Sequence, residues 1–234
     1  MSEDLGSESK SVGGLAARVS LPVGYEPRYP YPLMVLFHGR GGNEEQVQRL
    51  VPHLSGRNYI CLSLRGPEVL GERKDGTPAC SWGSPKSYTS KIEDSVLRAI
   101  HWTLRAYHVH SERIYLAGLC DGSSVAYRIG LNSPESFGGV IALNGQLLPA
   151  GTAGPIFRMD EVRGFRVFIG HGIANAKTPL SLAEDSFKAL YAAGADVKLM
   201  TYPTTHRLHG RMLRDINRWV IDRINAEHDA LVIG

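Results

Sequence analysis

Short, almost continuous hydrophobic runs recur along the chain and predict the strands of a buried sheet. Such runs are typical of parallel strands, because helices cover both faces of a parallel sheet. Seven runs fit this description, at residues 15–21, 33–37, 59–64, 113–118, 139–144, 166–171 and 197–202.

Helical periodicity appears between several of these runs. Apolar residues recur at helical spacing in three segments: Ile92, Val96, Ala99, Ile100 and Leu104; Ala183, Phe187, Leu190 and Tyr191; and Leu213, Ile216, Val220, Ile221 and Ile224. Strands that alternate with helices are typical of α/β proteins. The sequence therefore predicts a mostly parallel, doubly wound sheet with helices on both faces.

The chain has 234 residues, a length that suits one domain, and it contains no internal repeat. Residues 1–13 are rich in Ser, Glu and Gly, and this composition predicts a disordered N-terminal tail. We therefore expect a single domain over residues 14–234.

Charge and cysteine content exclude several kinds of protein. The basic excess is small, 26 Lys and Arg against 23 Asp and Glu, so no nucleic-acid partner is expected. Three cysteines are too few for a disulfide framework. No apolar run approaches the ~18 residues that span a bilayer, and the polar N-terminus lacks the pattern of a signal peptide. Without a metal-binding or nucleotide-binding motif, we expect a cytoplasmic protein that uses no cofactor and no metal.

The stretch "GLCDG", Gly118 to Gly122, joins a predicted strand to a predicted helix and has the form G-x-nucleophile-x-G. Small residues on either side of the nucleophile let the strand and the helix pass closely. Cys120 then lies at a helix N-terminus, where the backbone dipoles lower the pKa of a thiol. Cys120 is therefore a candidate nucleophile; the alternative is a buried, inert cysteine.

A glycine-rich stretch, "HGRGG", follows the second predicted strand at residues 38–42. Such a turn can direct a backbone N–H toward the reaction centre. Together with the N–H of the residue after the nucleophile, it would form an oxyanion hole with two donors. Arg40 and Asp121 are the candidate donors, and a simple glycine-rich loop is the alternative.

Five motifs occur in order: "LFHGRGG", "SERIYLAGLCDGSS", "FGGVIALNG", "IGHGIANAKTP" and "YPTTHRLHGRMLRDINRW". In these motifs the chain resembles the phospholipase/carboxylesterase group of α/β hydrolases, which is related to the dienelactone hydrolases and polyester depolymerases. The resemblance runs from about Leu15 to Trp219. It implies a single-domain α/β-hydrolase fold, with the nucleophile at Cys120, the catalytic histidine at His206 and the acid position at Asn175.

Two of these three positions depart from the serine pattern of the family. An amide in place of the aspartate lowers the rate of a serine protease by about 10⁴, because the histidine takes the wrong tautomer. A thiol ionises more readily than a hydroxyl, and Cys-His-Asn is the grouping of papain-like proteases. We therefore expect Cys120, His206 and Asn175 to act together, with thiolate and imidazolium as a possible resting pair. Asp121, where the esterases frequently have glutamine, could raise the Cys120 pKa.

These features predict a carboxylesterase-like or thioesterase-like hydrolase. Its substrate would be a small or medium-sized ester, thioester or lactone, and a thioester acyl-enzyme would form on Cys120.

Trp82 is a candidate wall of the substrate pocket, with loop packing as its alternative. His209 is a less favoured alternative to His206, while His38 and His171 suit structural roles. A thiol-dependent acyltransferase and an inactive relative that binds a small carbonyl ligand remain open, as does the oligomeric state.

Overall fold

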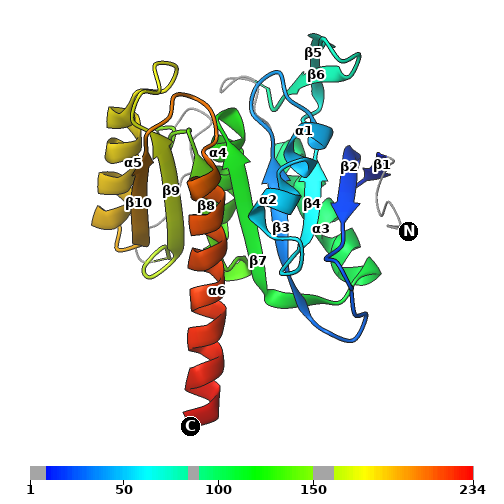
Figure 1. Cartoon of the computed structure of the whole chain (residues 1–234), viewed down its shortest axis with the longest axis vertical. Coiled ribbons are helices and arrows are strands. Elements are labelled where there is room, and N and C mark those ends of the chain that lie inside the picture. The colour runs from blue at the N-terminus through cyan, green and yellow to red at the C-terminus, as the bar shows by residue number, and fades with distance from the viewer. Residues whose placement is uncertain (1–8, 84–89, 150–160, 234) are drawn as a thin grey trace.

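The structure is a computed structural model that describes residues 9–83, 90–149 and 161–233. An eight-stranded sheet has the order β1-β2-β4-β3-β7-β8-β9-β10 (Figure 1). Neighbouring strands from β4 to β10 are parallel, whereas β1 and β2 are antiparallel to their neighbours. These strands are β1 (Lys10–Val12), β2 (Leu15–Ser20), β3 (Tyr31–Phe37), β4 (Ile60–Leu64), β7 (Val109–Leu119), β8 (Gly139–Leu143), β9 (Arg166–Gly172) and β10 (Asp196–Tyr202).

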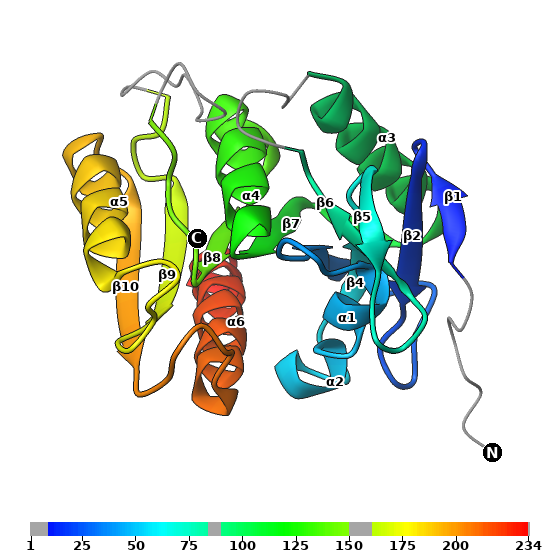
Figure 2. The ribbon, with the colours of Figure 1, turned by 90° about the horizontal axis from the view of Figure 1, so that it is seen from above.

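Helices cover both faces of this sheet, as Figure 2 shows. One face carries α3 (Ser90–Ala106), α4 (Asp121–Asn132) and α5 (Leu180–Ala192). The other carries α1 (Glu44–Gln48), α2 (Val51–Leu54) and α6 (Gly210–Ile233). A short 3₁₀ turn, η1 (Pro134–Ser136), follows α4. The prediction of a mostly parallel α/β fold with helices on both faces is confirmed. No helix of the described ranges is long and apolar enough to cross a membrane.

Strand β3 illustrates why the buried strands lack alternating polarity. Leu33, Val35 and Phe37 pack with α3, α4 and α5, and Met34 and Leu36 pack on the opposite face. All five side chains are at most 5% exposed. Because successive side chains of a strand point to opposite faces, a sheet covered on both sides favours apolar residues at successive positions.

All seven predicted strands are present, but three further strands escaped prediction. Strand β1 lies within the predicted tail, so the prediction of disorder is wrong for residues 10–12; residues 1–8 lie outside the described part. Lys10 pairs with Ala17 of β2, and Val12 packs into the core at 3% exposure. A hairpin of β5 (Glu68–Glu72) and β6 (Pro78–Ser81) forms a separate two-stranded sheet. β1 and β6 have only three and four residues, and β5 is exposed at every position, so none of them forms a long apolar run.

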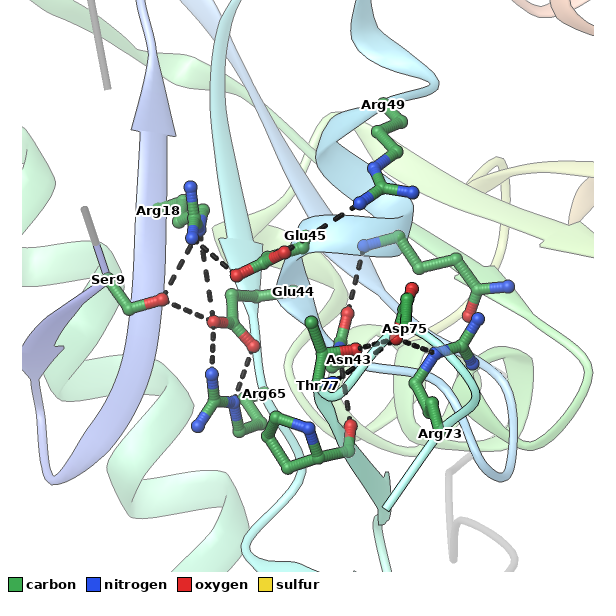
Figure 3. Close-up of polar contacts among 12 residues, drawn as sticks. Ser9, Arg18, Asn43, Glu44, Glu45, Arg49, Arg65, Arg73, Asp75 and Thr77 are labelled. Atoms are coloured by element: carbon green, nitrogen blue, oxygen red, sulfur yellow. Dashed lines mark hydrogen bonds and ion pairs between the residues drawn. The ribbon is translucent and has the colours of Figure 1, made fainter. Parts of the chain in front are cut away.

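A buried carboxylate fixes the start of α1 (Figure 3). The Glu44 side chain is fully buried and accepts hydrogen bonds from Nε and Nη2 of Arg65, each at 2.5 Å. The Ser9 hydroxyl donates to the same carboxylate. Burial by itself raises the Glu44 pKa, but the hydrogen bonds from Arg65 and Ser9 outweigh burial and lower it. This cluster anchors the segment that directly follows the "HGRGG" loop.

Candidate active site

The carboxyl ends of β3, β7, β8, β9 and β10 meet at one edge of the sheet, where open α/β sheets bind ligands. The predicted site residues lie at this edge, on loops or, for Asp121, at the first residue of α4. Cys120 follows β7, Asn175 follows β9, and His206 follows β10. Arg40 follows β3. Trp82 enters from the loop after β6.

Cys120 occupies the turn between β7 and α4 with an unusual backbone conformation, φ 51° and ψ −116°. The neighbouring glycines explain how this turn can form. A Cβ atom at Gly118 would collide with the carbonyl of Gly122, and one at Gly122 would collide with the carbonyl of Phe37. The predicted strand–turn–helix geometry is confirmed, and it holds a non-glycine residue in a strained conformation typical of functional sites.

The Cys120 thiol is hydrogen-bonded to Oδ1 of Asp121, with Sγ and Oδ1 3.4 Å apart. Burial raises the Cys120 pKa to about 11, with further contributions from the charge and the hydrogen bond of Asp121. The hydrogen bond from the backbone N–H of Asp121 lowers the Cys120 pKa. The predicted lowering by the helix N-terminus is therefore wrong here, because desolvation and the adjacent carboxylate outweigh the helix dipole. Cys120 is a protonated thiol at neutral pH.

His206 and Asn175 are joined by a hydrogen bond between Nδ1 of the imidazole and Oδ1 of the amide, 3.0 Å apart. The same Oδ1 accepts the backbone N–H groups of Lys177 and Thr178, each at 3.1 Å. These two backbone donors identify this atom as the amide oxygen. Since an amide oxygen only accepts, Nδ1 of His206 carries the proton and Nε2 is free to act as a base.

Asn144 connects the loops after β8, β9 and β10, and sequence analysis missed it. Its Oδ1 accepts the N–H of Gly172 at 2.9 Å and lies 3.4 Å from Nδ2 of Asn175. Its Nδ2 donates to the carbonyl of Arg207 at 3.3 Å. Asn144 has a φ of 51°, a conformation that asparagine tolerates better than most residues. The sequence feature that could have identified Asn144 is its position directly after a buried strand.

No hydrogen bond joins the Cys120 thiol to the His206 imidazole in the described structure, although both side chains line one cavity. Burial lowers the His206 pKa, and the charges of Lys177 and His171 lower it further. The resting pair is therefore a neutral thiol and a neutral imidazole, and the expected thiolate–imidazolium pair is wrong for this structure. Catalytic hydrogen bonds are often long in unliganded enzymes and shorten when substrate binds.

The loop of residues 38–42 lies beside the nucleophile, since a Cβ atom at Gly39 would be 3.2 Å from that of Cys120. The β5–β6 hairpin holds this loop in place. Gly41 donates to the carbonyl of Cys80, and Cys80 donates to the carbonyl of Gly42, both at 2.8 Å. Within the described ranges, the N–H of Arg40 has no acceptor, whereas that of Asp121 faces the Cys120 sulfur. Both remain candidate oxyanion donors.

Trp82 and His38 support the same loop. Trp82 donates from Nε1 to the carbonyl of His38 at 2.9 Å, and its side chain lines a cavity beside Cys120. Nδ1 of His38 is 2.8 Å from the carbonyl of Gly39, and Nε2 accepts the N–H of Gly66 at 2.8 Å. Burial lowers the His38 pKa to about 4. Trp82 thus serves both loop packing and the pocket wall, while both ring nitrogens of His38 bind backbone groups.

Neither of the two other histidines considered from the sequence is placed to act as the base, although Nε2 of His171 lies 3.3 Å from Nδ2 of Asn175. His171 is buried, and its Nε2 lies 2.8 Å from the carbonyl of Thr178, which suits a structural role. His209 accepts the backbone N–H of Arg211 at 3.2 Å and lines neither cavity beside Cys120. His206, whose imidazole is oriented by Asn175, is therefore the better candidate base.

Two cavities meet at Cys120. The Trp82 cavity, about 280 Å³, is lined by apolar side chains that include Trp82, Val125, Leu148 and Leu182. The His206 cavity, about 380 Å³, is lined by side chains that include Val47, Leu143, His206 and Leu208. Both cavities also include Arg40, Cys120, Asp121 and Lys177. The described residues contain no group of three or more His, Cys, Asp or Glu side chains that could hold a metal ion.

Comparison with known proteins identifies relatives of this arrangement. A family model described as Phospholipase/Carboxylesterase matches residues 26–222. No curated protein is significantly similar in sequence. A carboxylesterase from Mesorhizobium loti superposes with a TM-score of 0.71 at 16% identity, covering 93% of this chain and 99% of that one.

Two further solved structures have the same architecture. The Bacillus cereus carboxylesterase gives a TM-score of 0.68 at 16% identity, with 89% of this chain and 94% of that chain covered. A ferulic acid esterase from Anaeromyces mucronatus, solved with ferulic acid, gives a TM-score of 0.65 at 15% identity, with 93% of this chain and 91% of that chain covered. At these identities the likeness shows a shared fold.

Proposed function

The chain belongs to the phospholipase/carboxylesterase family, and from that premise we propose that it hydrolyses small or medium-sized esters or thioesters through Cys120, His206 and Asn175. The hydrogen bond between His206 and Asn175 carries the proposal. It leaves Nε2 of His206 as a proton acceptor in the cavity that Cys120 also lines. The esterase activity of the family supports the reaction class, and the cysteine nucleophile is our inference.

The reaction begins with transfer of the Cys120 proton to Nε2 of His206 as the sulfur attacks the carbonyl carbon. A neutral thiol with a raised pKa requires proton transfer to accompany the attack. The backbone N–H groups of Arg40 and Asp121 stabilise the oxyanion of the tetrahedral intermediate. His206 then gives its proton to the leaving group as the bond to that group breaks, which leaves a thioester on Cys120.

Water resolves the thioester in the second half of the reaction. Nε2 of His206 removes a proton from the attacking water, and the resulting intermediate collapses with the Cys120 sulfur as leaving group. The sulfur regains the proton from His206, and the carboxylic acid leaves. Asn175 holds the imidazole through Nδ1 in both halves and carries no charge in either.

Turnover of 4-nitrophenyl acetate and butyrate tests this proposal. We expect hydrolysis by the parent, an acetyl adduct on Cys120 in mass spectra of rapidly quenched samples, and loss of both in Cys120→Ala. Cys61 and Cys80 are buried and serve as internal controls for the adduct. Hydrolysis that is unchanged in Cys120→Ala would exclude Cys120 as the nucleophile.

A second function, binding of a small carbonyl compound without turnover, is favoured by one observation. The Cys120 thiol is bonded to Asp121 instead of His206, and its pKa is raised. Incubating the protein with candidate ligands distinguishes hydrolysis from binding without turnover. Ligands that raise the melting temperature and are recovered intact after a day, with no adduct on Cys120, would support binding alone.

A further inference from the structure

Two cationic side chains line the cavities that meet at the reaction centre. Arg40 belongs to the loop after β3, and Lys177 belongs to the loop after β9. Both are exposed, and both line the Trp82 cavity as well as the His206 cavity. Since these cavities meet at Cys120, the two positive charges border the path by which a substrate reaches the thiol.

No ion pair joins Arg40 or Lys177 to a carboxylate in the described ranges, whereas other arginines near this edge are paired. Arg65, for example, binds Glu44, and Arg18 binds Glu45.

Asp121 is the one acidic residue among those that line the two cavities in the described chain. Its Oδ1 accepts from the Cys120 thiol, and it forms no ion pair with either cation. The side chains around Cys120 therefore carry one more positive than negative charge when His206 is neutral.

The Lys177 charge acts on the groups proposed to react. After burial, it is the largest influence on the His206 pKa, and it also affects the Cys120 pKa. The backbone N–H of Lys177 donates to Oδ1 of Asn175 at 3.1 Å, which holds the main chain of Lys177 beside the residue that orients His206. A negative group of a substrate next to His206 would therefore meet this ammonium group.

We propose that Arg40 and Lys177 form an anion subsite that selects esters or thioesters whose leaving group carries a carboxylate. His206 lines the larger cavity and must protonate the leaving group, which places that group within reach of Lys177. Two unpaired cations near one apolar cavity repel each other, and a bound carboxylate relieves this repulsion. The selection of substrates rests on the proposed hydrolysis, whereas binding of the anion does not depend on it.

The kinetic test compares two aryl acetates of equal size, 3-acetoxybenzoate and 3-acetoxybenzamide, followed by ultraviolet absorbance of the released phenol. We expect kcat/KM to be about tenfold higher for the carboxylate than for the amide. Lys177→Gln and Arg40→Gln should each reduce this ratio about threefold, and the double variant should bring it close to one. Lys198→Gln, which removes an exposed charge outside both cavities, should leave the ratio unchanged.

The binding test uses Cys120→Ala and the reaction products. Titration calorimetry should give tighter binding of 3-hydroxybenzoate than of 3-hydroxybenzamide at low salt, and Lys177→Gln should reduce the ratio of the two dissociation constants about threefold. Equal kcat/KM for the two esters together with equal binding of the two products would overturn the anion subsite. Selective binding of the benzoate without hydrolysis of any ester would support the subsite and contradict the hydrolase function. Hydrolysis of both esters at equal kcat/KM, with equal binding of the two products, would support the hydrolase function and contradict the anion subsite.

Discussion

The Cys120 thiol is hydrogen-bonded to the carboxylate of Asp121, 3.4 Å away, and not to the imidazole of His206. Cys120 and Asp121 are adjacent in sequence at the start of α4, so the backbone turn at Cys120 also places the carboxylate beside the thiol. The carboxylate stabilises the protonated thiol through its charge and its lone pair. The residue that follows Cys120 therefore lowers its reactivity further, in addition to the effect of burial.

Replacing Asp121 by asparagine should make Cys120 more reactive. The change removes the negative charge that helps to raise the thiol pKa, so the pKa should fall and the thiolate fraction at pH 8 should rise. We expect alkylation by iodoacetamide to be roughly threefold to tenfold faster, since one pKa unit changes the thiolate fraction tenfold. Mass spectrometry of the Cys120 peptide measures the rate. Asp185→Asn, on the exposed side of α5, is the matched control.

The pH dependence of hydrolysis should follow the resting protonation of the pair. The His206 pKa is lowered from 6.5, so the imidazole is a neutral base at every pH above that value and loses this role only in acid. The Cys120 pKa is raised to about 11, so thiolate becomes more abundant throughout the alkaline range. Because the neutral pair is the reactive form, we expect kcat/KM to rise in acid as His206 loses its proton, to level off near neutral pH, and to rise again only as the pH approaches the Cys120 pKa of about 11. A bell-shaped profile centred near neutrality would contradict a neutral resting pair.

Substitutions at Asn175 should show that this residue orients His206. Asn175→Ala removes the acceptor for Nδ1 and should lower kcat by about a hundredfold, within the range expected for disabling a general base. Cys120→Ser should be nearly inactive, and Cys120→Ser with Asn175→Asp should recover part of the loss. A double-mutant cycle on ester hydrolysis measures the coupling. Full activity of Asn175→Ala would remove Asn175 from the mechanism.

Recovery through Asn175→Asp should remain partial because of Asn144. Nδ2 of Asn175 faces Oδ1 of Asn144, and an aspartate would place a second oxygen against that atom. We expect Asn175→Asp by itself to cost about 1–2 kcal/mol of unfolding free energy, the penalty for an unsatisfied buried polar group. Urea denaturation measures this loss, and Asn175→Ala provides the comparison for loss of the amide alone.

Glu44→Gln should destabilise the fold in a pH-dependent manner. The Glu44 pKa is lowered in the folded state, so its contribution is present above the ordinary value of 4.5 and is lost as the pH falls through the folded pKa. At pH 7 we expect a loss of about 2 kcal/mol, below the usual value for breaking a buried pair because Arg65 is partly exposed. Urea denaturation at pH 7 and pH 3.5 measures this loss. Glu45→Gln, whose carboxylate is 25% exposed, should cost less than about 1 kcal/mol.

The sequence by itself determined the parts of this protein that depend on local patterns. All seven predicted apolar runs became strands, because a sheet covered on both faces favours apolar residues at successive positions. The glycines around Cys120 predicted the turn, since backbone atoms occupy the space that their side chains would need. The family resemblance assigned Asn175 and His206 to one site, and the structure places them after two paired strands and joins them by a hydrogen bond.

The tertiary structure alone decided the protonation of the site and the supports of its loops. The helix N-terminus beside Cys120 predicts a more acidic thiol, yet burial and the Asp121 carboxylate make it less acidic. Asn144 and the β5–β6 hairpin were not foreseen, because their roles are contacts between segments distant in sequence. A local pattern reflects the neighbours of a residue along the chain, whereas a pKa and a loop position depend on solvent exclusion and charges that only folding brings together.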